Sequence, residues 1–148
     1  MGGRNATEHA VMHAMSQRGG SKVVGFKGAN HGHGLAFTQF AHPEMSNTSL
    51  NWPCVDFPQS NSDESKALEK ARSEMRAGGV SAVVIEPTNW QTGAAVSDNF
   101  INELGSIAHE SEAALIVDET NTGCGASGKG FWQYQGHAAD YLSFGRRT

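Results

Sequence analysis

Two short runs of consecutive apolar residues constrain the fold of this chain more than any other feature. They are Ala82–Ile85 (AVVI) and Ala114–Val117 (ALIV), and an acidic residue follows each of them directly. A run without alternation of apolar and polar residues is typical of a strand that is buried on both faces. Such strands belong to parallel sheets covered by helices on both sides, so the sequence predicts an α/β fold.

Helical patterns alternate with these and other strand-like segments. Pairs of glycines end two of the helical patterns, and Ser97-Asp98 can cap a third. We expect helices over residues 7–18, 63–77 and from 98 onward, and strands over residues 21–26, 80–86, 113–118 and 141–144. This order predicts a parallel sheet with crossover helices.

The helices available to cover this sheet are few. A chain of 148 residues is expected to form one domain, over residues 1–148. Residues 27–62 show no sustained period, which is uncommon in a domain unless the segment is functional or packs on something else. With only three expected helices, we predict that missing chain segments or a protein partner complete the cover of the sheet.

Composition excludes several classes of partner. The net charge is -4 and no long run of Lys and Arg occurs, which argues against nucleic acid and anionic membranes as partners. No apolar stretch is long enough for a membrane span. The two cysteines, Cys54 and Cys124, fit free thiols in a reducing compartment better than a disulfide scaffold.

Three motifs suggest chemistry when each is taken alone. Gly123–Gly128 matches the spacing G-x-G-x-x-G, but no helical pattern follows it, so we do not predict a dinucleotide site. His31 and His33 flank a glycine and could share a metal ion, yet no third and fourth ligand accompany them, so we predict no metal. Asp118 ends a buried strand at the carboxyl edge, where open α/β sheets bind ligands.

Asp118 belongs to a series of short motifs that occur in a fixed order along the chain. The motifs are Gly2–Ala10, Phe26–His33, Asn51–Pro58, Ile85–Pro87, Ile116–Glu119 and Thr122–Trp132. Together they resemble the class III, pyridoxal-phosphate-dependent aminotransferases. Asn51–Pro58 is similar to a segment that marks the eukaryotic 4-aminobutyrate aminotransferase branch, and it accounts for the stretch without a period.

The resemblance implies a fold, a cofactor and a compartment. By resemblance, residues 1–148 are a partial large domain of the fold-type I transferases, and the branch is mitochondrial. Family members bind pyridoxal 5'-phosphate, and the matching residues of this chain are Gly3 and Arg4 for the phosphate and Asp118 for the pyridine nitrogen. His33 stands where the family has the arginine that binds the substrate carboxylate.

Other positions depart from the family pattern. Arg146 stands where the family has the lysine that forms a Schiff base with the cofactor, and the five lysines of the chain all align elsewhere. A guanidinium cannot be deprotonated in a protein, so it supplies no neutral amine. Asn30 replaces the aromatic residue that stacks on the ring. Gln91 or Thr92 replaces a Glu before Gly93, and Thr120-Asn121 replaces Val-Gln.

Three hypotheses follow. In the first, the chain is a catalytically inactive aminotransferase remnant without catalytic residue or cofactor, and it acts as a structural or accessory subunit of a larger mitochondrial assembly. In the second, it is a fragment of an active 4-aminobutyrate aminotransferase that transfers an amino group to 2-oxoglutarate, with the lysine supplied from elsewhere. In the third, it binds pyridoxal phosphate or phosphate without catalysis, through Gly3, Arg4 and Asp118.

Overall fold

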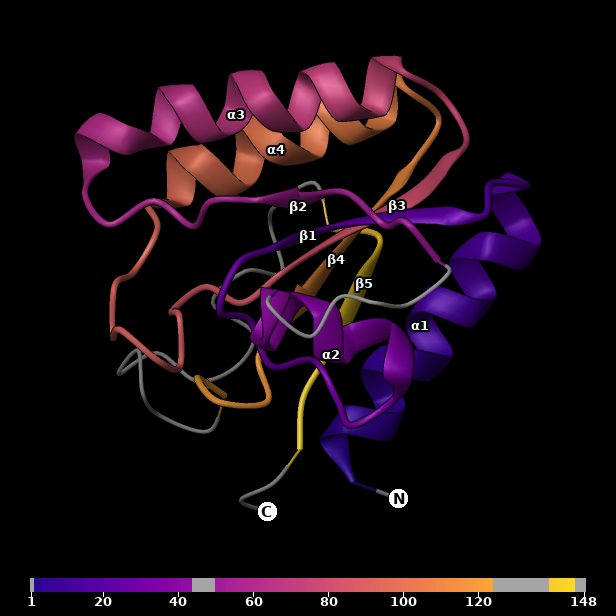
Figure 1. Cartoon of the computed structure of the whole chain (residues 1–148), viewed down its shortest axis with the longest axis horizontal. Helices are drawn as coiled ribbons and strands as arrows, with labels where there is room; N and C mark the ends of the chain where they lie inside the picture. Colours follow the sequence, from indigo (N-terminus) through magenta and orange to yellow (C-terminus); the bar gives the residue numbers. More distant parts are fainter. Residues whose placement is uncertain (1, 44–49, 124–138, 146–148) are drawn as a thin grey trace.

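A parallel sheet of five strands forms the centre of the chain (Figure 1). The structure is a computed structural model that describes residues 2–43, 50–123 and 139–145. The strands are β1 (Lys22–Phe26), β2 (Cys54–Val55), β3 (Val80–Ile85), β4 (Ala114–Asp118) and β5 (Tyr141–Ser143). They lie in the order β2-β1-β3-β4-β5, and every neighbouring pair is parallel. The predicted α/β fold with a parallel sheet is confirmed.

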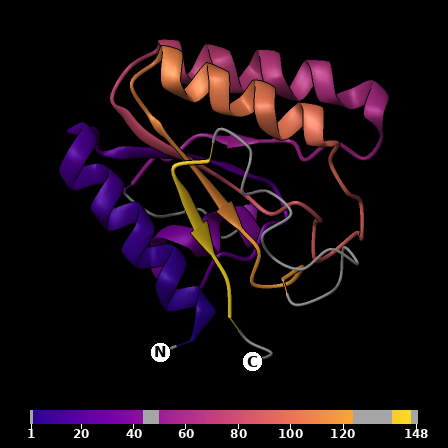
Figure 2. The ribbon, with the colours of Figure 1, turned by 180° about the vertical axis from the view of Figure 1, so that it is seen from behind.

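Two helices cover each face of this sheet (Figures 1 and 2). The helices are α1 (Gly3–Arg18), α2 (Leu35–Ala41), α3 (Asn61–Arg76) and α4 (Asp98–Glu110). One layer of buried side chains lies between the sheet and α3 with α4, and the other lies between the sheet and α1 with α2. None of the helices in the described ranges is long and apolar enough to cross a bilayer.

The two apolar runs form the middle of the sheet. All residues of β3 and β4 are buried, as their lack of alternation predicts. Along β4, Leu115 and Val117 pack in the layer of α3 and α4, whereas Ala114 and Ile116 pack in the layer of α1 and α2. Because side chains alternate along a strand, Asp118 continues the second row and enters the layer of α1 and α2.

The helix ends follow the predicted signals. Gly19 has a φ of 75° and its N–H donates to the carbonyl of Met15, so it ends α1 in the left-handed conformation that glycine adopts without strain. Ser97 caps α4 by accepting a hydrogen bond from the N–H of Phe100 at 3.0 Å. These caps fix where the chain turns back toward the sheet.

The prediction that residues 27–62 contain no regular structure is wrong. They contain α2 and the short strand β2. With only seven residues, α2 is too short to show a helical period, and its place is determined by Phe37 and Phe40, which pack with Trp52. The expected count of three helices is therefore wrong as well, because α2 shares the cover of one sheet face with α1. The partner that we inferred from an incomplete cover stays a prediction.

One carboxylate connects β5 to the rest of the fold through hydrogen bonds. Asp140, directly before β5, accepts hydrogen bonds from Arg18 of α1 at 3.0 Å and from His109 of α4 at 2.8 Å. It also accepts the backbone N–H of Leu115 at 2.9 Å. Asp140 thus joins both helical layers and β4 at the start of β5, and so determines where β5 lies at the edge of the sheet.

Replacing Asp140 by alanine is expected to lower the free energy of unfolding by about 1–3 kcal/mol, because the buried N–H of Leu115 loses its acceptor. Urea denaturation of the purified chain measures this difference. Glu110→Ala is the matched control, since it removes only the exposed pair with Arg72 and should cost less than about 1 kcal/mol. Equal losses in the two variants would contradict the role given to Asp140.

Candidate functional site

Polar side chains gather at the carboxyl edge of the sheet. Asp118 ends β4, Ser143 ends β5, Glu86 follows β3, and His31 lies in the loop after β1. The amino end of α1 lies at the same edge, beside β5 (Figures 1 and 2), and Thr7 of this helix contacts Ser143. The described part of the chain therefore brings four strands and one helix terminus to one place.

Asp118 is the centre of this group. Its side chain is completely buried. The Oδ2 atom lies 2.8 Å from Nδ1 of His31, and Oδ1 accepts hydrogen bonds from the N–H of Thr120 at 3.0 Å and from the hydroxyl of Ser143 at 3.2 Å. Burial by itself raises the pKa of Asp118, but the hydrogen bond and charge of His31, with the bonds of Thr120, lower the pKa below its ordinary value. Asp118 is therefore an ionised carboxylate at neutral pH.

His31 is held in one orientation by aromatic rings. It is fully buried, and its ring meets Phe37 and Phe40 edge-on at centroid distances of 5.9 and 6.3 Å. Because a carboxylate only accepts hydrogen bonds, the proton between the two groups is on Nδ1 of His31. The Nε2 atom has no hydrogen-bond partner in the described part of the chain. His31 thus acts on Asp118 through Nδ1.

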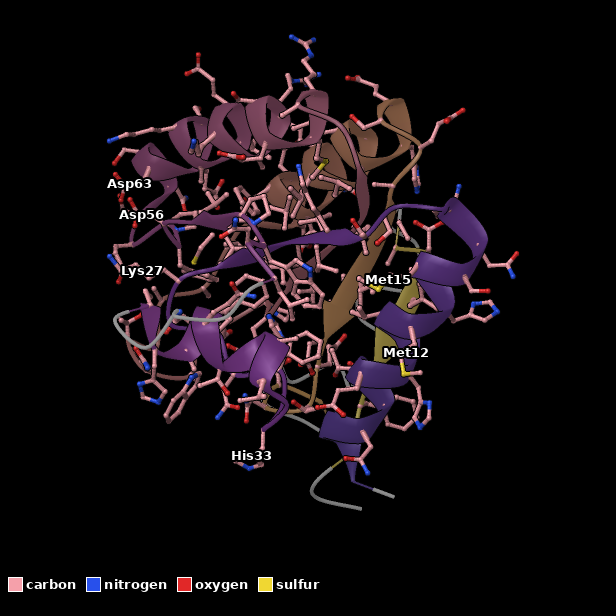
Figure 3. All side chains as sticks on the ribbon, turned by 45° about the vertical axis from the view of Figure 1, so that its right-hand side comes forward. Met12, Met15, Lys27, His33, Asp56 and Asp63 are labelled. Atoms are coloured by element: carbon pink, nitrogen blue, oxygen red, sulfur yellow. The ribbon has the colours of Figure 1, made fainter. Side chains whose placement is uncertain are left out.

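His33, by contrast, does not join this group. Its side chain is exposed, and Figure 3 shows it projecting outward from the loop before α2. His31 and His33 therefore do not face one site. Among the residues that the structure describes, no group of three or more His, Cys, Asp and Glu side chains could hold a metal ion. The proposed role of His33 in binding a substrate carboxylate stays a prediction.

Glu86 binds both asparagines that depart from the family pattern. Its Oε1 accepts the side-chain amide of Asn121 at 2.6 Å, and its Oε2 accepts the backbone N–H of Asn30 at 3.3 Å. Burial is the main cause that raises the pKa of Glu86 above its ordinary value, and the negative charge of Asp118 adds to it. Glu86 thus links the loops after β1 and β4 across the end of β3.

Glu119 is a third buried acid at this edge. Both of its carboxyl oxygens, and the hydroxyl of Thr122, have no hydrogen-bond partner within the described ranges. Burial, followed by the charge of Asp118, raises the pKa of Glu119 to about 7. Near neutral pH this group exchanges a proton easily, whereas Asp118 stays charged.

The predicted phosphate site lies at the start of α1. The helix begins at Gly3, and its first hydrogen bond inside the turn is donated by Asn5 to the carbonyl of Gly2 at 3.0 Å. The first N–H groups of a helix have no partner inside it, and they carry a partial positive charge that favours anions. Arg146, the other predicted key residue, lies outside the described residues.

A cavity at this edge of the sheet lies away from Asp118. A cavity of about 520 Å³ lies at the ends of β1 and β2, and Lys27, Asp56, Asn89 and Gln91 are among its lining residues. Asp118, His31 and His33 do not line it. Lys27 and Asp56 lie close together in Figure 3, well away from His33. Hydrogen bonds, not this cavity, therefore define the candidate site.

Sequence reasoning found Asp118 but missed His31, Ser143 and Thr7 as its partners. Ser143 could have been found, because a parallel pairing of the last two strands places it opposite Asp118. His31 was considered only as a metal ligand. Thr7 is separated from Ser143 by 136 positions, and the sequence around Thr7 does not indicate this contact.

Comparisons with known proteins agree with this geometry. The sequence pattern of the family described as Aminotransferase class-III matches residues 1–147. An L-lysine-epsilon aminotransferase of Streptomyces clavuligerus is 31% identical over 118 residues, which are 76% of this chain and 26% of that relative. The mitochondrial 4-aminobutyrate aminotransferase of Rattus norvegicus is 28% identical over 152 residues, which cover 84% of this chain and 30% of that relative.

A solved structure gives the same result for the fold. Lysine aminotransferase from M. tuberculosis in the internal aldimine form matches with a TM-score of 0.80 at 26% identity, over 98% of this chain and 40% of that chain. The family resemblance seen in the motifs is confirmed, with relatives from both the lysine and the 4-aminobutyrate branches. The chain spans well under half the length of these relatives.

The raised pKa of Glu119 predicts how stability depends on pH. In the folded chain the pKa is about 7 against an ordinary value of 4.5, so between these values the folded state binds more protons than the unfolded state. The contribution of Glu119 to the free energy of unfolding is therefore complete below pH 4.5 and is lost as pH rises through about 7. Relative to wild type, Glu119→Gln should gain up to about 3 kcal/mol of unfolding free energy as pH rises across this window.

Urea denaturation of both proteins at several pH values across this window measures the effect. The exposed Glu69 of α3 provides the matched control, because Glu69→Gln makes the same chemical change on a solvated surface. A difference between wild type and Glu119→Gln that stays constant with pH would show that Glu119 does not titrate in this range.

Proposed function

Because this chain belongs to the class-III aminotransferases, we propose that it is an aminotransferase-like subunit that does not itself transfer an amino group and that has a structural or accessory role in a larger assembly. The observation that carries this proposal is Arg146, which stands in the sequence where the family has its lysine. Ser143 lies opposite Asp118 in the sheet, and three residues further along the chain stands Arg146 in place of the family's lysine.

The described residues fit the noncovalent part of a pyridoxal phosphate site. When bound, this cofactor supplies an electron sink for bonds at an amino-bearing carbon. The ionised Asp118, whose pKa is lowered by the hydrogen bond and charge of His31, suits a protonated ring nitrogen. By resemblance Gly3 and Arg4 stand where the family binds the phosphate, and the first N–H groups of a helix such as α1 favour an anion.

The residues of this chain do not fit the covalent part of a pyridoxal phosphate site. An imine between the cofactor and the chain requires a neutral primary amine, and so does the proton transfer that follows. The guanidinium of Arg146 has a pKa above about 12 and provides neither. At the position of the stacking aromatic residue, Asn30 offers no ring face and its N–H is directed to Glu86. We therefore expect no covalently bound cofactor and no catalytic residue on this chain.

A partner and a mitochondrial location complete the proposal. Among the residues that the structure describes, five large apolar side chains are exposed and available for contacts with a partner: Met12, Leu35, Leu50, Trp90 and Phe144. Figure 3 shows Met12 on the outer side of α1. The mitochondrial location rests on the similarity to the rat 4-aminobutyrate aminotransferase.

A second function is favoured by the hydrogen bonds that hold Asp118 in its ionised form. Such a site, in a chain that spans only 26–40% of its relatives, also suits a segment of a working aminotransferase that acts on 4-aminobutyrate and 2-oxoglutarate. In that case the lysine is supplied by another segment or another subunit. The two functions differ in whether the assembly that contains this chain transfers amino groups.

Trapping the cofactor with borohydride tests the role of Arg146. We expect Arg146→Lys, incubated with pyridoxal phosphate and reduced, to gain one pyridoxyl group that maps to residue 146, in addition to any labelling of the exposed lysines that the wild-type chain shows equally. Arg76→Lys, at the exposed end of α3, is the matched control for an added lysine. One pyridoxyl group that forms on a single lysine of the wild-type chain at equimolar pyridoxal phosphate would overturn the proposal of an inactive subunit.

Purification of the native assembly separates the two functions. We expect this chain to elute with a larger particle and to be needed for its formation. Removing the chain should therefore shift the particle to smaller size and leave the transfer of amino groups from 4-aminobutyrate to 2-oxoglutarate unchanged. If the purified particle performs this transfer and loses it without the chain, the second function is correct.

A further inference from the structure

The turn of residues 119–123 follows β4 directly and is closed by a backbone hydrogen bond. The N–H of Gly123 donates to the carbonyl of Glu119 at 2.7 Å. Inside the turn, the N–H of Thr120 donates to Oδ1 of Asp118 at 3.0 Å. The turn therefore holds one of the donors on which the buried carboxylate of Asp118 depends.

The same turn holds a donor for a second buried acid. The side-chain amide of Asn121 donates to Oε1 of Glu86 at 2.6 Å, and the side chain of Glu86 is buried. Because Thr120 and Asn121 are neighbours in the chain, the turn cannot open without moving both donors. A change in this short segment thus acts on two of the three acids at the carboxyl edge of the sheet.

The third acid, Glu119, is the first residue of the turn. Its exposed fraction is 0%, and neither of its carboxyl oxygens has a hydrogen-bond partner in the described part of the chain. The hydroxyl of Thr122, three residues further along the same turn, is also buried and has no partner there. A carboxylate that is buried without donors is strongly disfavoured in its ionised form. In the closed turn Glu119 must therefore carry a proton, or it must leave its buried position.

The groups around Glu119 do not favour its negative charge. The adjacent Asp118 is ionised, and burial and this charge are the two causes that raise the pKa of Glu119. His31, the nearest titratable base, bonds Asp118 at 2.8 Å. Glu86 across the end of β3 responds to the charges of His31 and Asp118. From β5, the carbonyl of Ser143 accepts the backbone N–H of Glu119 at 2.8 Å and leaves the side chain without a donor.

We propose that the turn of residues 119–123 is a proton-controlled switch: a proton on Glu119 keeps it closed, and ionisation of Glu119 favours an open form in which this carboxylate reaches water. Opening withdraws the donors of the turn from Asp118 and Glu86, so one proton on Glu119 controls the hydrogen bonding of both neighbours. The switch is a property of this chain alone, and it does not depend on whether the chain binds a cofactor or transfers amino groups.

The direction and size of the effect follow from linkage between the proton and the closed turn. The pKa of Glu119 is about 7 in the closed turn, against an ordinary value of 4.5 for a glutamate in water. The closed form binds the proton more tightly, so its stabilisation is complete below pH 4.5 and is lost as pH rises through about 7. Between pH 5 and pH 7, opening should become about 40-fold more frequent.

Hydrogen exchange of single amides, followed by NMR in the full chain between pH 5 and pH 7, tests the switch. Protection factors are corrected for the intrinsic pH dependence of exchange. In the wild type, the amides of Thr120 and Gly123 should lose protection by about 40-fold over this range. Glu119→Gln cannot ionise, so its protection factors at the same two amides should stay constant with pH.

The amides of β3 distinguish local opening from unfolding of the whole chain. Val83 and Val84 lie in the middle of the sheet and are fully buried. At every pH, Thr120 and Gly123 should exchange faster than these two residues, because the turn opens without the sheet. Equal protection at the turn and in β3 would show that Glu119 reaches water only when the chain unfolds, and this result would overturn the switch.

Two further variants complete the comparison. Glu69→Gln makes the same chemical change on the exposed side of α3 and should keep the pH dependence of the wild type. Glu119→Met removes both the charge and the unpaired oxygens, so it should also give constant protection, and it replaces Glu119→Gln if that variant does not fold. Loss of protection with rising pH that is equal in wild type and in the Glu119 variants would overturn the proposal.

Discussion

The negative charge of Asp118 inside the fold is the interaction on which the rest of the candidate site depends. A buried carboxylate is costly unless donors surround it, and here the donors come from distant parts of the chain. His31 follows β1, Thr120 follows β4, and Ser143 ends β5. Each of these elements must be in place before the charge is stabilised. Formation of the site therefore depends on the order of the strands in the sheet.

Much of the fold could be predicted because its signals are local. The apolar runs of β3 and β4 and the glycines after α1 and α3 act within a few residues. The contacts of the site are not local, since His31 and Asp118 are 87 positions apart. That contact depends on the sheet order, in which β1 and β4 are separated only by β3. Short segments held by tertiary packing, such as α2, escape prediction for the same reason.

The three acids at the carboxyl edge have different protonation behaviour, and this difference defines the charge of the site. Asp118 has donors on both oxygens and a lowered pKa, whereas the pKa values of Glu86 and Glu119 are raised chiefly by burial. Environments that separate the pKa values of neighbouring acids assign them different roles. Asp118 is charged near neutral pH, whereas burial disfavours the charged form of Glu86 and Glu119.

The carboxylate and the amine of a pyridoxal phosphate site are under different physical constraints. Loss of Asp118 would leave the N–H of Thr120 and the buried groups of His31 and Ser143 without their acceptor, at about 1–3 kcal/mol for each unsatisfied group. Folding alone therefore requires this residue. The imine-forming amine is required by the reaction and not by the hydrogen bonding of the core. The hydrogen bonds of Asp118 can consequently be kept by folding alone, whatever residue stands at position 146.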